Sequence, residues 1–405
     1  MKSNEWIRNA ASCLVVGGLL AAAATAHAGL MDQDALTGDW GGKRSSMADK
    51  GINFEAVYTG EYFLNNGGAA RGDGYLDNKD VTLELDGETL MGINGATLFF
   101  YVLGNEGGDP SRYVGDAQAT SNIETDSITW KLYEAWWEQR FGGSYSAKFG
   151  LIDLNSEFDV TETAGLFLNS SHGIGPDFSQ SGNGPSIFPT TSLALRLSAG
   201  IGDSGYAQLG IFDGVSGDVN NGEGTQVELH PGKEGWLVAA EAGLAQGLDE
   251  DDDRPFQKLA LGYWMYTEDV AAADTVTGVP ETGSGFYVIA DRAFSDRLSA
   301  FVRFGMANDS AYGIGSYLGT GVVLTGLMND EDQLGLGIAH AMIGDALATA
   351  DPTLEAAETN IELSYQTALT PWLTVKPDIQ YVIAPSADPA LDNAVITSVR
   401  FEAAF

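Results

Sequence analysis

The segment from Leu132 to Arg140 carries an aromatic ring between carboxylates, a combination that can bind a ligand. If this segment is a strand with Tyr133 and Trp137 on the membrane side, the residues that alternate with them face inward: Leu132, Glu134, Trp136, Glu138 and Arg140. The Trp136 ring could then offer an apolar face for a ligand to stack on, while the neighbouring carboxylates accept hydrogen bonds from its polar groups. Alternatively, the Trp136–Trp137 pair marks an aromatic girdle at a membrane surface.

Hydrolytic chemistry finds less support in the sequence. Beyond residue 28 there are three histidines, His172, His230 and His340, and no Gly-x-Ser-x-Gly elbow. Barrel enzymes need not carry that elbow, so a membrane-embedded lipase or protease with a Ser/His/acid site stays as a rival class. We nevertheless expect no catalytic residues.

Neither a cofactor nor a metal ion is expected. Gly42-Lys43-Arg44 lacks the flanking residues of a phosphate-binding loop. The acidic segments 249–253 and 218–224 could hold calcium, but neither has EF-hand spacing, so we interpret both as solvated turns.

Alternation of apolar and polar residues indicates which elements position these side chains. In the final stretch, Val395 to Phe405, every second residue is apolar or small, and the chain ends on an aromatic residue. The same split recurs upstream, with the inward set Thr374, Lys376, Asp378 and Gln380 alternating with Leu373, Val375, Pro377, Ile379 and Tyr381. One apolar and one polar face per strand is typical of a transmembrane antiparallel β-barrel with an aqueous lumen.

Short and long gaps alternate between these strands. Seven short turns and eight longer loops predict about sixteen strands over residues 52–405. The first three long loops along the chain are expected at 65–77, 105–126 and 155–190. The third is so large and apolar that we expect it to fold into the lumen. Residues 29–51 precede the barrel, and Leu36 to Gly51 predicts a short helix outside the wall.

The first 28 residues predict an export signal. Lys2 and Arg8 precede an apolar stretch that is too short to span a bilayer comfortably, and Ala26-His27-Ala28 fits a cleavage site. The only cysteine, Cys13, lies in this segment, so the mature chain has no thiol or disulfide. Export with barrel strands predicts the outer membrane of a Gram-negative bacterium.

The charge balance excludes some partners. With 20 basic and 56 acidic residues, the formal net charge is -36. Nucleic acid and a dedicated phosphate channel both demand Lys and Arg, so we expect neither. The acidity itself is compatible with a soluble surface in salty surroundings or with a cation-leaning pore.

Several long motifs resemble one known family. The segments Leu36 to Ile52, Leu103 to Ile123, Lys131 to Glu138, Lys148 to Asp159 and Val375 to Pro385 closely resemble, in order, the OprB-type carbohydrate-selective porins of the bacterial outer membrane. Phe167 to Ser171 also fits this order. The resemblance spans essentially the whole mature chain.

The resemblance implies passive, carbohydrate-selective diffusion of small neutral sugars through a usually monomeric sixteen-stranded barrel, with a short N-terminal helix near its periplasmic mouth. The Trp136 ring would then stack on a sugar ring, and the carboxylates beside it would replace water on the sugar hydroxyls. A general cation-leaning diffusion pore is the alternative. We expect the partners to be outer-membrane lipid, lipopolysaccharide and, through Phe405, the barrel assembly machinery. Beyond the segment 132–140, the residues we expect to line the pore are Glu106, Arg112, Asp153, Arg196, Arg303, Lys376, Asp378, Gln380 and Arg400. For each charged member the alternative is a structural ion pair within the lumen.

Overall fold

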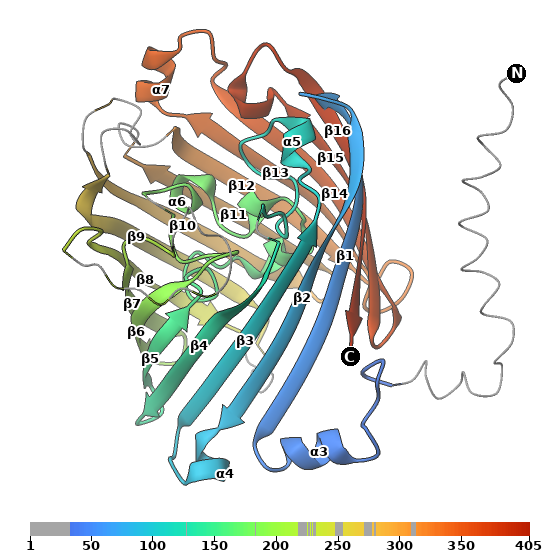
Figure 1. The fold of residues 1–405 in the computed structure, drawn as a ribbon, viewed down its shortest axis with the longest axis vertical. Helices are drawn as coiled ribbons and strands as arrows, with labels where there is room; N and C mark the ends of the chain where they lie inside the picture. Colours follow the sequence, from blue (N-terminus) through green and yellow to red (C-terminus); the bar gives the residue numbers. More distant parts are fainter. Residues whose placement is uncertain are drawn as a thin grey trace, which may run out of the picture.

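A closed barrel of sixteen antiparallel strands makes up most of the described chain (Figure 1). The computed structural model describes residues 33–126, 128–182, 184–217, 225, 227, 229, 232–247, 254–270, 278, 281–308 and 313–405. Each strand pairs with its sequence neighbours, and β1 closes the barrel against β16. The predicted strand number and topology are therefore confirmed. The expected leader 1–28 lies outside the described residues.

The elements follow the chain in a regular alternation. The strands are β1 Ile52–Gly68, β2 Gly72–Asp86, β3 Ala96–Gly107, β4 Trp130–Phe141, β5 Tyr145–Ile152, β6 Ser192–Ile201, β7 Gly205–Asp213, β8 Trp236–Gln246, β9 Gln257–Val270, β10 Glu281–Ser295, β11 Leu298–Ala307, β12 Ile314–Thr325, β13 Gln333–Ile343, β14 Ala357–Thr370, β15 Leu373–Ile383 and β16 Asp392–Ala404. The helices are α3 Lys43–Ala48, α4 Gly87–Met91, α5 Ser111–Val114, α6 Pro176–Ser179 and α7 Asp345–Ala350, with 3-10 turns η1 Glu162–Leu166, η2 Ser170–His172 and η4 Pro385–Ala387.

The strand boundaries depart most from the turn chemistry at the first loop. The loop predicted at 65–77 is much shorter, because β1 runs to Gly68 and β2 begins at Gly72. The ladder between these strands continues to the pair Asn65 and Gly72, so the polar residues there belong to strands that rise above their neighbours. Polar composition suggested a loop, whereas strand pairing decided the structure.

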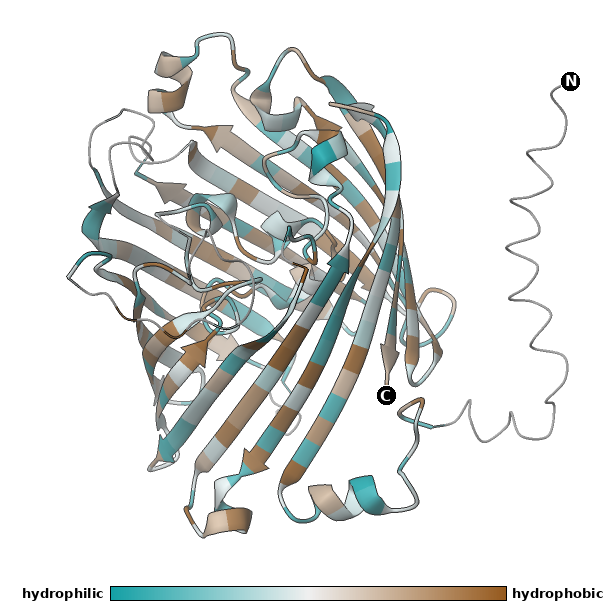
Figure 2. Ribbon diagram, in the orientation of Figure 1, coloured by the Kyte–Doolittle hydropathy of each residue, from teal (hydrophilic) through white to brown (hydrophobic). Residues whose placement is uncertain are grey.

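The two faces of the wall differ as the alternation predicts. In β15, Ile379 and Tyr381 are 42% and 40% exposed. On the other face of the strand, Lys376, Asp378 and Gln380 are buried. Figure 2 shows this as alternating brown and teal bands along the strands. Charged side chains near the middle of a bilayer cost about 2–4 kcal/mol when they face lipid, which explains their placement inside. No helix in the described part of the chain is long and apolar enough to cross a bilayer.

Helix α3 lies below the foot of β1, outside the wall, as expected (Figure 1). The Asp39 carboxylate accepts hydrogen bonds from the Ser45 amide and hydroxyl, each at 2.8 Å, and so holds the first turn. The Ser45 hydrogen bonds lower the pKa of Asp39, so the carboxylate stays ionised and remains a strong acceptor. Gly51 ends the segment with φ +76°, a conformation that favours glycine.

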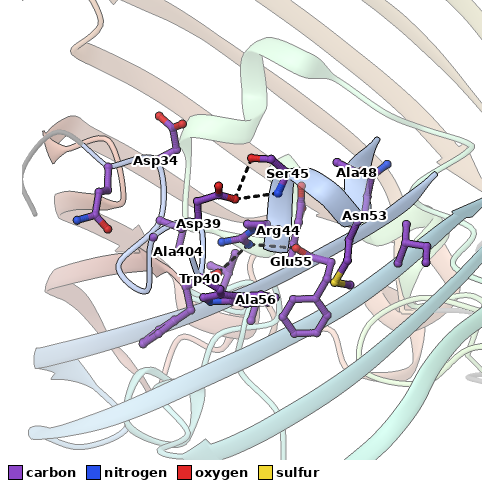
Figure 3. Close-up of a pocket in the computed structure, with 18 residues that line it drawn as sticks. Asp34, Asp39, Trp40, Arg44, Ser45, Ala48, Asn53, Glu55, Ala56 and Ala404 are labelled. Atoms are coloured by element: carbon purple, nitrogen blue, oxygen red, sulfur yellow. Dashed lines mark hydrogen bonds between the residues drawn. The ribbon is translucent and has the colours of Figure 1, made fainter. Parts of the chain in front are cut away.

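The N-terminal segment also covers the seam of the barrel. β1 pairs with β16 only from Val57 onward, so the foot of β1 extends past the last pair. The Arg44 guanidinium donates to the carbonyl oxygens of Phe54 at 3.0 Å and Phe405 at 2.8 Å, and the Leu36 amide donates to Ala404 at 2.8 Å. The resulting groove has a volume of about 660 Å³. Figure 3 shows Arg44 among the side chains that line it.

Candidate functional site

Two loops fold into the barrel and meet inside it (Figure 1). The β5–β6 loop, residues 153–191, carries η1, η2 and α6, and its apolar side chains pack on the inner wall. Phe178 stacks on Trp264 of β9 with ring centroids 5.0 Å apart and 0° between the planes. Phe158, in the same cluster, is fully buried with Phe212 of β7. The prediction that this loop enters the lumen is confirmed, and its apolar residues explain why.

Polar side chains of the wall fasten the same loop around the lumen. Glu241 of β8 accepts from the Asp159 amide at 3.1 Å, and Asp291 of β10 accepts from the Thr163 amide at 2.9 Å. Glu362 of β14 accepts from the amides of Leu168 and Asn169. These three wall carboxylates therefore accept hydrogen bonds from the loop backbone, since carboxylates are strong acceptors for buried N–H groups.

The β3–β4 loop, residues 108–129, enters from the neighbouring strand pair, since β4 pairs with β5, and it reaches across to β14. Glu358 of β14 accepts from the Ala117 and Gln118 amides at 2.7 and 3.1 Å. The two loops then bind each other through the Ser170 amide and the Ala119 carbonyl at 2.9 Å, and through Asn122 and Leu168 at 2.8 Å. We call these two loops together the two-loop constriction.

A third group of lumen residues lies on β3 to β6, and we call it the β3–β6 cluster: Phe99, Glu134, Trp136, Glu138, Lys148, Glu157 and Arg196. Trp136 is half-buried, and its indole N–H donates to Glu134 at 3.0 Å. Phe99 from one neighbouring strand stacks on the ring at 4.9 Å, and Lys148 from the other lies 3.9 Å from the ring centroid. The ring therefore faces the lumen rather than an outer aromatic girdle.

The charges of the β3–β6 cluster compensate one another. Arg196 donates to Glu138 at 2.7 Å and to Glu157 at 2.8 Å, and Lys148 pairs with Glu157. Such pairs present donors and acceptors along the wall while cancelling most of their charge. The arrangement suits a ligand with many hydroxyl groups better than an ion.

Two expected face assignments in β4, those of Tyr133 and Leu132, are wrong. Tyr133 is buried at 3% exposure and its ring packs edge-on against lumen-facing Tyr101, so it faces inward. A β-bulge causes this, because Glu134 pairs with Tyr101 and Leu132 pairs with Val102, leaving Tyr133 as the extra residue. Leu132 consequently shares the outward face of Val102, and a strict period of two fails at this point.

Two further expected pore residues do not lie on the inner wall. Glu106 shares the face of Phe100 and Val102, which are both exposed toward lipid, and its carboxylate is 3.9 Å from Lys79. It was assigned to a loop, but β3 continues to Gly107. Arg112 is exposed in α5 within the β3–β4 loop, where its amide donates to Asp109. Arg140, by contrast, keeps the inward face of β4 opposite Ser146, and it is exposed at the end of the strand, 3.8 Å from Glu138.

The remaining expected residues do face the lumen. Arg400 binds Glu61 of β1 at 2.6 Å and the hydroxyl of Ser121 at 3.3 Å, whereas Gln380 donates to the Thr120 carbonyl at 2.7 Å. These contacts fasten the β3–β4 loop. Lys376 is 5% exposed beside Arg400 in the ladder.

Arg303, Asp153 and Asp378 complete the set of expected residues. Arg303 is buried and binds Asp159 and Asp177 of the β5–β6 loop. Asp153 begins that loop, accepts from the Asn155 amide at 2.9 Å, and has its pKa raised to about 6 by burial. Asp378 accepts from Gln380 at 3.2 Å.

Sequence reasoning missed several residues of the site. Phe99, Lys148 and Glu157 complete the β3–β6 cluster, and Glu358 completes the fastening of the β3–β4 loop. The period of two places Phe99 and Lys148 on inner faces, so that signal was available. Glu157 lies in a loop, and no local pattern indicates that it meets β5 and β6.

The described histidines are not placed for hydrolysis. His172 is buried between Phe167 and Phe301, and burial lowers its pKa to about 3. His340 lies on the outward face of β13, where Nδ1 contacts the Thr359 hydroxyl at 2.7 Å. His230 and both acidic segments considered for calcium lie outside the described residues. Across the described ranges, no three or more His, Cys, Asp or Glu side chains are grouped to hold a metal ion.

Comparison with known proteins agrees with this geometry. Residues 70–405 match the sequence model of a family described as "Carbohydrate-selective porin, OprB family". Porin B of Pseudomonas aeruginosa is 26% identical over 465 residues, with 100% of both chains covered. The putative porin QuiX of Acinetobacter baylyi is 21% identical, covering 92% of this chain and 94% of that protein.

Among solved structures, the high pH structure of Pseudomonas putida OprB superimposes with a TM-score of 0.81. The two sequences are 23% identical, and the superposition covers 93% of this chain and 99% of that chain. The channel DcaP of Acinetobacter baumannii gives a TM-score of 0.55 at 10% identity, covering 87% of this chain and 97% of that chain. At these identities the likeness shows a shared barrel fold.

Proposed function

Because the chain belongs to the OprB family of carbohydrate-selective porins, we propose that small neutral sugars pass through its lumen along the β3–β6 cluster. The protein is a porin of the Gram-negative outer membrane, and its substrates are carbohydrates that diffuse passively. Which lumen residues bind them is our proposal.

The observation that carries this proposal is the Trp136 ring among compensated charges. Aromatic rings bind the apolar face of a sugar, and paired Glu, Lys and Arg side chains offer acceptors and donors for its hydroxyls. Phe99 and Lys148 already contact the ring, so it is held in one orientation before a ligand arrives. A pre-oriented ring loses little conformational entropy on binding.

Single-channel conductance of the purified protein in a planar bilayer tests the proposal. Glucose, maltose and an uncharged non-sugar of similar size are added in turn while the ionic current is recorded. Saturable block by a sugar, without block by the size-matched control, is the expected result. Equal responses to all three compounds would instead favour a general diffusion pore.

A cation-leaning general pore is the second candidate, and the net charge of -36 favours it. Its test is the reversal potential in a salt gradient, measured in the same bilayer. Strong cation selectivity together with no sugar block would support this candidate over the first.

Family membership makes the chain a channel protein, and we further propose that it has no lipase or protease activity. Neither described histidine is hydrogen-bonded to a serine. Release of a chromogenic ester or peptide by the purified barrel would contradict this. We also propose that the barrel is monomeric and that Phe405 engages the assembly machinery during insertion.

A further inference from the structure

Arg303 holds the β5–β6 loop at two separate places. Its Nε and Nη2 donate to the two Asp159 oxygens at 3.0 and 2.6 Å, and Nη1 donates to Asp177 of α6. Asp159 also accepts from the Gly175 amide at 3.4 Å, which joins the two places directly. The loop segment from Asp159 to Asp177, with η1 and η2, is thereby closed on itself.

The surroundings of Arg303 keep the guanidinium in place. The ring centroids of Tyr287 and Tyr317 each lie 5.4 Å from its carbon, so aromatic faces hold the cation. Gly175 and Gly305 border the same space, and a Cβ at either residue would collide with the guanidinium or with Asp177. Two glycines at this point allow the backbone of loop and wall to approach the ion pair.

Other contacts between the wall and this segment bind it at one place each. Lys258 donates to the Val160 carbonyl at 2.8 Å, Asp291 binds Thr163, and Glu362 binds the adjoining residues Leu168 and Asn169. Losing one of these contacts leaves the rest of the segment held. Losing Arg303 releases both ends of the closed segment and leaves two buried carboxylates without their cation.

From this geometry we propose that Arg303 is the positioning residue that sets the size limit of the channel. It does so through the two-loop constriction and need not touch the sugar itself. The proposal rests on the proposed function only in that solutes pass through the lumen. Because the strand ladders close the barrel without the loop, removing Arg303 widens the passage while the wall stays intact.

The test compares Arg303→Gln with Arg303→Lys, Asp177→Asn and the control Arg292→Gln. Arg292 is an exposed residue on the outward face of neighbouring β10, away from the loop. Each protein is placed in liposomes, and swelling rates are measured with uncharged polymers of graded size. Folding is checked by the difference in electrophoretic mobility between heated and unheated samples.

We expect Arg303→Gln to admit polymers that the unaltered protein excludes, with several-fold faster swelling at the original limit. Arg303→Lys keeps the positive charge but not the forked guanidinium that reaches both carboxylates. The size limit of this variant should therefore lie between those of the unaltered protein and Arg303→Gln. Asp177→Asn shifts the limit in the same direction and serves if Arg303→Gln does not fold. An unchanged limit in folded Arg303→Gln, or in Asp177→Asn in its place, overturns the proposal.

Failure of this proposal and failure of the proposed function give different results. Polymer exclusion reports passage size and does not depend on sugar binding. If sugars do not block the channel but its size limit still rises in Arg303→Gln, the role of Arg303 stands and the sugar site is refuted. If sugars block the channel but the size limit is unchanged in Arg303→Gln, the sugar site stands and the role of Arg303 is refuted.

Discussion

Trp136 is the residue at which sugar binding and ion flow can be separated. Replacing it with alanine removes the ring that a sugar would stack on, and aromatic contacts of this kind contribute about 0.5–1.5 kcal/mol. We expect Trp136→Ala to weaken sugar block several-fold while ion conductance changes little. Sugar titration of the single-channel current measures both quantities in one experiment.

The adjacent Trp137 gives a matched control for this prediction. It alternates with Trp136 and therefore faces the membrane side of β4. Trp137→Ala should leave sugar block unchanged. Unaltered block in Trp136→Ala would refute the stacking role.

At the scale of elements, Arg44 of α3 fastens the foot of β1 to the C-terminus. Each of its two hydrogen bonds involves a charged donor, a class of bond that contributes about 1.5–3 kcal/mol. Because Arg44 covers carbonyls that no strand pairs, Arg44→Ala should lower the temperature at which the folded barrel converts to the slower, unfolded band on electrophoresis.

Lys43→Ala is the control for the seam, since Lys43 is the exposed preceding residue of the same helix. It removes a positive charge from α3 without removing the contacts to Phe54 and Phe405. Equal conversion temperatures for Arg44→Ala and Lys43→Ala would show that the seam does not depend on this side chain.

The β3–β4 loop should respond to pH through Asp116. Burial, followed by repulsion from Glu358, raises the pKa of Asp116 from 3.8 to about 7. The packed loop therefore keeps a proton that a free loop would lose, so its stability falls as the pH rises from about 4 to about 7. Burial also raises the pKa of Glu124, to about 10, which extends the loss to higher pH.

Protease access to this loop, or current noise, should accordingly increase between pH 4 and pH 7. Asp116→Asn should flatten that part of the profile because it removes the titrating carboxyl. Asp351→Asn should leave the profile unchanged, because it alters an exposed carboxyl whose pKa is lowered by hydrogen bonds from Thr353. A slope that survives in Asp116→Asn would assign the response to other groups.

The elements differ in how far sequence could predict them. Strand number, turns and faces follow from local patterns, so the alternation in β15 gave the correct inner set. The bulge at Tyr133 broke the period, and β3 extended through residues assigned to a loop, which misplaced Glu106. Pairings such as Arg303 with Asp177 or Glu157 with Arg196 join distant segments, and only the closed barrel brings them together.

At the scale of the whole molecule, the acidic residues behind the net charge of -36 differ in what they contact. Inside the barrel, Glu358 and Glu362 bind loop amides, while Glu138 and Glu157 are paired with cations. These carboxylates are compensated locally. Acidic groups outside these contacts make up the excess, and the field that they exert on passing ions extends only as far as the surrounding salt allows.

This distribution predicts that salt weakens cation preference but not sugar block. The Debye length falls from roughly 30 Å at 0.01 M to 3 Å at 1 M, so cation preference, measured as reversal potential, should weaken steeply over that range. Sugar block depends on ring contacts and hydrogen bonds within the β3–β6 cluster, and neutral sugars carry no charge for salt to screen. The half-blocking sugar concentration should therefore change little between the two salt concentrations. If block weakened in parallel with selectivity, unscreened charge rather than the compensated cluster would govern sugar entry.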